Sequence, residues 1–286
     1  MATSFSKLVR KDSPLVLPGA FDALSARLIE RAGFEGLFVG GFASLGARHA
    51  VPDVGLMGLA EISAVIRDIR KSTSLPMMVD ADDGYGDVKN VVHTVQTYAR
   101  MGIQAIFMED QQSPKRCGHL AGKSVVSAEV MEAKLRAAVG ERDAAGPYIV
   151  ARTDAGAVLG MDEALRRGER YLRAGADAIY IEAPETVEEL ALIGRHFKGE
   201  ANMTSMLEGG KTPILKPSDL HEMGYNIIIF GTTLLMRAAK VMITALDDIK
   251  SERLELVGTG VSLKDYFDLV DLQKWSGIEQ RYELET

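Results

Sequence analysis

The stretch VKNVVHTVQTYARMGIQAIFMEDQ, residues 88–111, decides the fold because it joins a helix pattern to a strand pattern through glycine. In 88–101, valines and a tyrosine recur at helical spacing, which predicts an amphipathic helix. Gly102 lies where a helix C-cap belongs, and the continuous apolar run 105–111 follows it. A helix that ends at glycine before a fully apolar strand is typical of a parallel sheet covered by helices.

The same unit recurs along the chain. Ala-Gly or Met-Gly precedes an apolar run at 32–33, 101–102, 174–175 and 223–224. The predicted strands are 15–21, 36–41, 75–82, 105–111, 148–155, 178–183, 202–206 and 226–231. The predicted helices are 22–32, 60–71, 88–101, 127–139, 161–174, 187–197 and 217–223. This order predicts an α/β fold, a (β/α)8 TIM-type barrel. A doubly wound sheet is the alternative, but it usually has a glycine-rich loop after the first strand, where this chain has Ala20-Phe21-Asp22.

The chain beyond the last predicted strand holds more helix than one barrel needs. Helical patterns cover 233–250 and 263–273. We therefore expect residues 1–286 to form one barrel domain, with 233–286 as a helical extension that packs on a neighbouring subunit. The alternative is a helix that caps its own barrel.

The overall composition limits the classes of binding partner. The net charge is −7 and the sequence pI about 5.4, which argues against a nucleic-acid or anionic-membrane surface. No apolar run approaches the length of a membrane span, and the first residues lack the apolar core of a signal peptide. A single cysteine suits a reducing compartment, so we expect a cytoplasmic protein that binds a small molecule.

That cysteine lies in Lys115-Arg116-Cys117-Gly118-His119. Two cations and an imidazole beside a thiol are the neighbours that lower its pKa and make it a usable acid or nucleophile. The alternative is a buried small hydrophobic residue, but a core cysteine does not favour two adjacent charges.

Acidic residues follow two of the predicted strands. Asp80 and Asp82 end one of them, and Glu109 ends the next. Because catalytic groups of a barrel lie at the carboxyl ends of its strands, these carboxylates are expected to converge. Hard oxygen ligands without histidine favour Mg²⁺, with Mn²⁺ as a second possibility. The alternative is a set of helix caps and surface ion pairs.

Further polar groups lie at other strand ends. Arg152 offers a bidentate guanidinium for a carboxylate or phosphate, although an ion pair with Glu182 or Glu109 competes with this role. Backbone N–H groups around Gly40-Gly41-Phe42 offer a place for a second anionic group. Strand 202–206 contributes Asn202 and Thr204.

These motifs together resemble the isocitrate lyase / phosphoenolpyruvate mutase superfamily along nearly the whole chain. The matching segments are Pro52-Asp53, Asp80-Ala81-Asp82-x-Gly84-Tyr85-Gly86, Glu109-Asp110-Gln111, Lys115-Arg116-Cys117-Gly118-His119 and Ala151-Arg152-Thr153-Asp154. The cysteine segment is similar to the gating-loop signature of the lyase branch, which includes 2-methylisocitrate and 2,3-dimethylmalate lyases.

The resemblance implies a barrel whose eighth helix is exchanged between subunits, usually in a homotetramer. It implies Mg²⁺ near Asp80, Asp82 and Glu109, and a gating loop, residues 113–124, that closes over the substrate. The implied substrate is a 2-hydroxy di- or tricarboxylate, cleaved to a 2-oxo acid such as pyruvate and a second acid. The implied catalytic residues are Lys115, Arg116, Cys117, His119 and Glu109, and the implied substrate-binding residues are Gly40, Gly41, Phe42, Asp53, Arg152, Glu182, Asn202, Thr204 and Gly231.

Three positions depart from the lyase pattern. Phe38 replaces a usual tyrosine, Gly40 a serine or threonine, and Gly231 a usual proline, which is serine in the branch that hydrolyses oxaloacetate. Two other functions therefore stay open: hydrolysis of oxaloacetate or of a phosphonopyruvate-like acid, and a barrel that has lost catalysis and serves as a scaffold. The acid itself and the catalytic base are not determined by these motifs.

Overall fold

The computed structural model describes residues 5–143 and 146–282 and divides the chain into two compact units. The first unit is Met1–Leu234 and the second is Leu235–Thr286. The second unit begins two residues after the start of the expected extension 233–286, and residues 283–286 lie outside the described part.

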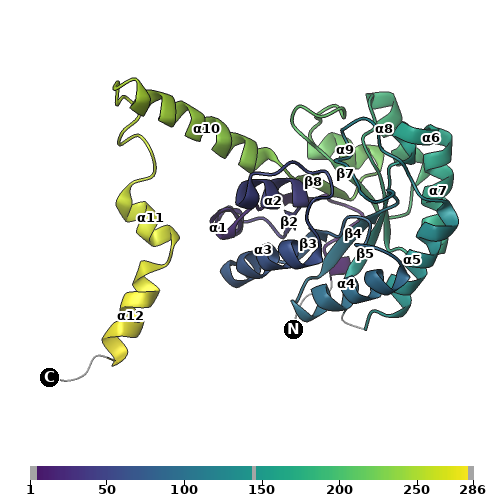
Figure 1. The fold of residues 1–286 in the computed structure, drawn as a ribbon, viewed down its shortest axis with the longest axis horizontal. Coiled ribbons are helices and arrows are strands. Elements are labelled where there is room, and N and C mark those ends of the chain that lie inside the picture. The colour runs from purple at the N-terminus through teal and green to yellow at the C-terminus, as the bar shows by residue number, and fades with distance from the viewer. Residues whose placement is uncertain (1–4, 144–145, 283–286) are drawn as a thin grey trace. The chain divides into compact units, whose positions relative to one another are not determined.

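The first unit is a barrel of eight parallel strands (Figure 1). Hydrogen-bonded neighbours follow the order β1-β8-β7-β6-β5-β4-β3-β2. The strands β1 and β2 are the two ends of this order. They are linked by an isolated β-bridge between Gly19 and Phe38 and by a 2.8 Å hydrogen bond from the Ala20 N–H to the Phe38 carbonyl, which nearly closes the barrel. The strands are β1 (Leu15–Pro18), β2 (Leu37–Val39), β3 (Met77–Asp80), β4 (Ala105–Glu109), β5 (Tyr148–Thr153), β6 (Ala178–Ile181), β7 (Asn202–Ser205) and β8 (Ile227–Phe230).

The predicted (β/α)8 barrel is therefore confirmed, and each of the eight predicted strands is present in shorter form. A short 3-10 helix, η1, precedes β1, and α-helices lie between the strands (Figure 1). They are η1 (Phe5–Lys7), α1 (Ala23–Arg31), α2 (Gly41–His49), α3 (Leu59–Ser72), α4 (Val88–Arg100), α5 (Ala128–Gly140), α6 (Ala155–Leu159), α7 (Met161–Arg173), α8 (Val187–His196) and α9 (Pro217–Met223).

Helix α4 shows why the opening stretch folds as predicted. The Asp87 side chain caps its first turn by accepting from the Lys89 N–H at 2.9 Å and the Asn90 N–H at 3.4 Å. Its buried face packs Val91 and Tyr98 against the sheet. Gly102 then takes a φ of +73°, a left-handed conformation that glycine adopts without steric cost, and the chain turns into β4.

Two helices after strand ends were not predicted. Helix α2 begins at Gly40-Gly41, without a side-chain cap, so the usual start signal is missing. Helix α6 has only five residues, too few for a periodic pattern. The predicted helix 263–273 is also wrong: it is two helices, separated near Asp271, whose φ is +57°.

The sheet divides the core into two layers. Residues inside the barrel, such as Leu17, Met78 and Val150, form one cluster, while residues under the helices form the other. Because successive side chains of a strand point to opposite faces, the inner cluster fixes which residues face the barrel axis at each strand end. This alternation positions the site described below.

The second unit is helical. Helix α10 (Thr233–Lys250) leads into it, and α11 (Leu263–Leu269) and α12 (Leu272–Tyr282) follow. Its large apolar side chains are mostly exposed: Val241, Leu246 and Trp275 are 66%, 66% and 62% accessible. None of the helices within the described residues is long and apolar enough to cross a membrane.

Candidate active site at the carboxyl ends of the strands

The last inward-facing residues of four neighbouring strands are polar and buried. Asp80 ends β3, Glu109 ends β4, Arg152 lies on β5, and Glu182 follows β6. Three of these side chains, Asp80, Arg152 and Glu182, line a cavity of about 60 Å³, here called the mouth cavity. This convergence agrees with the prediction for the carboxyl ends of the strands, where catalytic groups of barrels lie.

The carboxylates around the mouth cavity are buried. Burial, with Asp82 nearby, raises the pKa of Asp80 to about 7. Burial also raises the pKa of Asp82, and it raises that of Glu109 well above its ordinary value. The Glu109 Oε1 and Glu182 Oε2 atoms are buried and have no hydrogen-bond partner among the described residues. Such groups favour the arrival of positive charge or of a proton.

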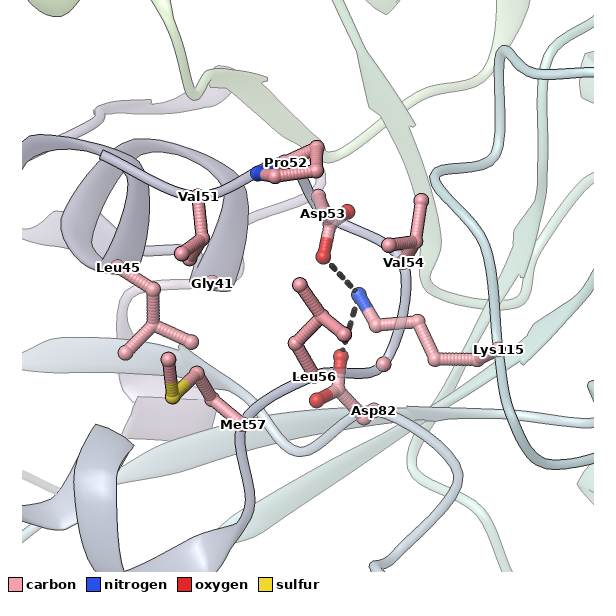
Figure 2. Close-up of a pocket in the computed structure, with 11 residues that line it drawn as sticks. Gly41, Leu45, Val51, Pro52, Asp53, Val54, Leu56, Met57, Asp82 and Lys115 are labelled. Carbon is pink, nitrogen blue, oxygen red and sulfur yellow. Dashed lines mark hydrogen bonds and ion pairs between the residues drawn. The ribbon is translucent and has the colours of Figure 1, made fainter. Parts of the chain in front are cut away.

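Lys115 lies among these carboxylates. Its ammonium pairs with Asp82 Oδ1 at 2.7 Å and with Asp53 Oδ1, as Figure 2 shows. Burial alone would lower the pKa of Lys115, but Asp82 and the other carboxylates outweigh it and raise the pKa well above its ordinary value. Lys115 is therefore a fixed cation that ties the gating loop to the segment after α2 and to the turn after β3.

Arg152 is surrounded by carboxylates. Its Nε and Nη2 donate to Asp154 at 2.9 and 3.1 Å, and its Nη1 lies 3.2 Å from Glu109 Oε2. Glu182 Oε1 lies 3.7 Å from Nη2. The guanidinium also lies over the rings of Phe107 and Tyr180. The ion pairs of Arg152 with Glu109 and Glu182, considered above as an alternative to substrate binding, are therefore present. Its pairing with Asp154 was not predicted.

Cys117 lines the mouth cavity from the gating loop, and its N–H donates to the Asp53 carbonyl at 3.0 Å. Burial raises the pKa of its thiol, so the expectation of a lowered pKa is wrong. The reason is geometric: the Lys115 ammonium faces Asp53 and Asp82, and Arg116 is exposed. A thiol in this setting is protonated at neutral pH.

His119 joins the gating loop to the loop after β7. Its Nδ1 accepts from the Lys211 N–H at 2.9 Å, which leaves the ring proton of the neutral form on Nε2. Nε2 lies 3.4 Å from Glu182 Oε1. Burial lowers the pKa of His119, so the neutral form prevails at pH 7. His119 therefore offers the cavity an N–H donor that carries no charge.

Lys123 closes the far end of the gating loop and was missed by the sequence analysis. Its side chain is 2% exposed, and its Nζ donates to the Gly118 carbonyl and to Asp154 Oδ1, the latter at 2.8 Å. Asp154 thus pairs with both Arg152 and Lys123. The signal in the sequence was a lysine next to Gly122 in a loop that already carried reactive residues.

Several predicted residues do not reach the mouth cavity. The side chain of Arg116 is exposed, and only its backbone is held, by the Gln111 amide at 2.8 and 2.9 Å. Asn202 and Thr204 point away from the cavity, because Met203 lies in the inner cluster and adjacent strand residues alternate. Ser205, the next inward position, lines the cavity instead.

The glycine positions are close to the cavity. Gly40 caps the N-terminus of α2, and Gly40 and Phe42 line the mouth cavity. Gly41 lies in the adjacent pocket between Leu45 and Asp53 (Figure 2). Gly231 also lines the mouth cavity. The predicted backbone N–H groups are therefore those of the first turn of a helix, where an anion is stabilised.

Whether a divalent metal ion could bind at this site depends on the side chains that offer donor atoms. Across residues 5–143 and 146–282, no group of three or more His, Cys, Asp or Glu side chains is arranged to hold a metal ion. The positive charges that face these carboxylates are those of Lys115, paired with Asp82, and Arg152, paired with Glu109. The buried carboxylates of Asp80, Asp82 and Glu109 nevertheless offer only oxygen donors, which is the ligand type that Mg²⁺ prefers, and Glu109 Oε1 has no hydrogen-bond partner among the described residues.

Comparison with known proteins identifies the class. Residues 5–250 match the family described as phosphoenolpyruvate phosphomutase, and the chain belongs to this family, within the superfamily that also holds isocitrate lyase. The resemblance inferred from the motifs is therefore confirmed.

Similar proteins include both lyases and a hydrolase. The chain is 38% identical over 283 residues to a 2,3-dimethylmalate lyase of Eubacterium barkeri, with 98% of each chain covered. It is 38% identical to a 2-methylisocitrate lyase of Halalkalibacterium halodurans, with 90% of this chain and 85% of that one covered. A solved oxaloacetate acetylhydrolase with bound 3,3-difluorooxalacetate superimposes with a TM-score of 0.92 at 28% identity, covering 97% of this chain and 95% of that one.

Proposed function

We propose that this protein is a Mg²⁺-dependent carbon–carbon lyase that cleaves a 2-hydroxy dicarboxylate or tricarboxylate into a 2-oxo acid and a second carboxylic acid. The observation that carries the proposal is the position of the Cys117 thiol. Cys117 belongs to the gating loop, which Lys115 and Lys123 hold at its two ends, and it lines the same small cavity as Asp80 and Arg152. Similarity to two lyases along most of the chain supports the same reaction.

The carboxylates would hold the metal ion. Asp80 and Asp82 are the proposed ligands, with Glu109 close by, and Mn²⁺ is an alternative to Mg²⁺. A bound divalent ion supplies positive charge that makes a substrate hydroxyl easier to deprotonate. Arg152 would bind a substrate carboxylate in exchange for part of its contact with Glu109 and Glu182, which lie 3.2 and 3.7 Å from it.

The rest of the cavity would stabilise the departing half of the substrate. Breaking the carbon–carbon bond leaves an enolate-like dianion, and the neutral His119 Nε2–H is placed to donate to it. Cys117, a protonated thiol, would then give its proton to the carbon. The amides at the start of α2 are positioned to bind the second carboxylate of the substrate.

The closed loop serves this chemistry. Lys115, Lys123 and His119 each bond to a different part of the barrel and so hold the loop over the cavity. Closure excludes water, which would otherwise protonate the enolate without control. Lys115 thus acts through the position of the loop, and Arg116 stays outside the proposed machinery because its side chain is exposed.

Hydrolysis of oxaloacetate is the second candidate. It is supported by the likeness to an oxaloacetate acetylhydrolase and by Thr232. Thr232 lines the mouth cavity, and its buried Oγ1 has no hydrogen-bond partner among the described residues. A hydroxyl in that position could orient a carbonyl group or a water molecule.

The two candidates differ in their products. We expect turnover of 2,3-dimethylmalate or 2-methylisocitrate to pyruvate, measured with coupled lactate dehydrogenase, and loss of this turnover after chelation with EDTA. Added Mg²⁺ should restore it, and Mn²⁺ in part. Release of oxalate and acetate from oxaloacetate, with no pyruvate from either hydroxy acid, would contradict the lyase proposal and favour hydrolysis.

Two further proposals concern the C-terminal extension, residues 233–286, and the cellular compartment of the protein. The exposed apolar residues of α10, among them Val241, Ile243 and Leu246, support packing on a neighbouring subunit, and we propose a homotetramer with exchanged C-terminal helices. The single free thiol, Cys117, supports a reducing compartment such as the cytoplasm.

A further inference from the structure

The three positions that depart from the lyase pattern meet in one place. Phe38, Gly40 and Gly231 all line the mouth cavity. A Cβ atom built on Gly40 would lie 2.7 Å from Phe38 Cε1, and one built on Gly231 would lie 3.1 Å from the same atom. The phenyl ring therefore occupies the space that side chains at 40 and 231 would need. The three residues form a single wall of the cavity, here called the phenyl wall.

The phenyl wall is rigid and apolar. The Phe38 ring is stacked on Phe107 with 5.6 Å between centroids and 15° between planes, and Phe107 meets Tyr180 edge-on at 5.8 Å. Phe38 itself is 5% exposed. Neither a phenyl ring nor the two glycines carry a side-chain hydrogen-bond donor. A charged substituent of a substrate placed against this wall would lose its water without gaining a partner.

The charges around the cavity lead to the same conclusion. Arg152 is the one lysine or arginine among the described residues that line the mouth cavity. Lys115 is paired with Asp53 and Asp82, and Lys123 with Asp154. Arg152 and the backbone amides at the start of α2 can bind two carboxylates. A third carboxylate would find no further cation in the cavity.

We infer that the phenyl wall is the subsite for the substituent on carbon 3 of the substrate, and that it selects a short alkyl group over a carboxymethyl group. This inference rests on the proposed lyase function. The two candidate acids make it testable: both carry a hydroxyl, a methyl and a carboxylate on carbon 2, and they differ at carbon 3. There, 2,3-dimethylmalate has a methyl group and 2-methylisocitrate has a carboxymethyl group.

The experiment compares kcat/KM for the two acids in three variants. The wild-type enzyme should prefer 2,3-dimethylmalate by at least about 10-fold, the scale on which pockets distinguish small substituents. Phe38→Leu removes the ring and should lower this ratio about 10-fold. Phe38→Leu/Gly40→Ser also makes room for a hydroxyl donor and should lower it further. Phe197→Leu, a buried phenylalanine outside the cavity, is the control and should leave the ratio unchanged.

The experiment distinguishes a failure of the alkyl subsite from a failure of the proposed lyase function. Equal or better cleavage of 2-methylisocitrate by the wild type, or an unchanged ratio in Phe38→Leu, would overturn the alkyl subsite while the lyase function stands. Cleavage of neither acid would overturn the proposed function and the subsite with it. Circular dichroism of each variant shows whether the barrel is intact, and because the readout is a ratio, a partial loss of folded enzyme does not change it.

Discussion

Replacing Cys117 with serine is expected to lower kcat by about 10²–10⁴-fold, the usual contribution of a positioned general acid. Serine keeps the size of the side chain and the backbone bond to the Asp53 carbonyl, which is 3.0 Å long. Its hydroxyl is a far weaker acid than the thiol, so protonation of the enolate slows while binding is retained. Stopped-flow measurement of pyruvate release, with Mg²⁺ saturating, gives the rate.

A binding measurement separates chemistry from structure for this variant. Calorimetric titration of Cys117→Ser with Mg²⁺ and oxalate, an analogue of an enolate, should match the wild type. Unchanged turnover in Cys117→Ser would remove the thiol from the mechanism. Loss of turnover together with loss of oxalate binding would instead assign Cys117 a structural role.

Gly118→Ala should also lower the activity strongly while leaving the barrel folded. A Cβ atom at this position would lie 2.0 Å from Glu182 Oε1 and 2.5 Å from Arg152 Nη2. Both partners are buried and fixed by other contacts, so the gating loop would have to stay raised. We expect kcat/KM to fall at least about 10²-fold, because displacement of catalytic groups by about 1 Å already costs this much.

Gly140→Ala is the matched control for this variant. Gly140 ends α5, and nothing lies within 4 Å of a Cβ atom built on it. Its kinetics should equal those of the wild type. Limited proteolysis supplies the second readout: with Mg²⁺ and oxalate, residues 113–124 should be protected in the wild type and in Gly140→Ala and cleaved in Gly118→Ala. Cleavage of the loop together with normal kcat/KM in Gly118→Ala would show that closure is not needed, and protection of the loop would show that the added Cβ atom does not hold it open.

The fold was largely predictable because its signals are local. Apolar runs and glycine stops such as Gly102 specify strands and helix ends without reference to distant residues. Barrel geometry then predicts which strand ends meet, and this was enough to bring Asp80, Glu109 and Arg152 together.

The details of the site depend on packing, which is not local. The sequence of β7 does not reveal its register, so Asn202 and Thr204 were chosen where Ser205 faces the cavity. The thiol of Cys117 has cationic neighbours in sequence, yet burial determines the direction of its pKa shift. The role of Lys123 depends on a contact with Asp154, 31 residues away, that no motif indicates.

In the proposed mechanism the Cys117 thiol delivers a proton to an enolate inside a closed cavity. Cleavage of 2,3-dimethylmalate in D₂O, with the propionate esterified by a chiral alcohol so that NMR distinguishes the two faces, is the test. We expect pyruvate and propionate with one deuteron on carbon 2, placed on a single face, because a fixed thiol protonates from one side. Propionate labelled equally on both faces, or the absence of a 2-oxo acid product, would contradict it.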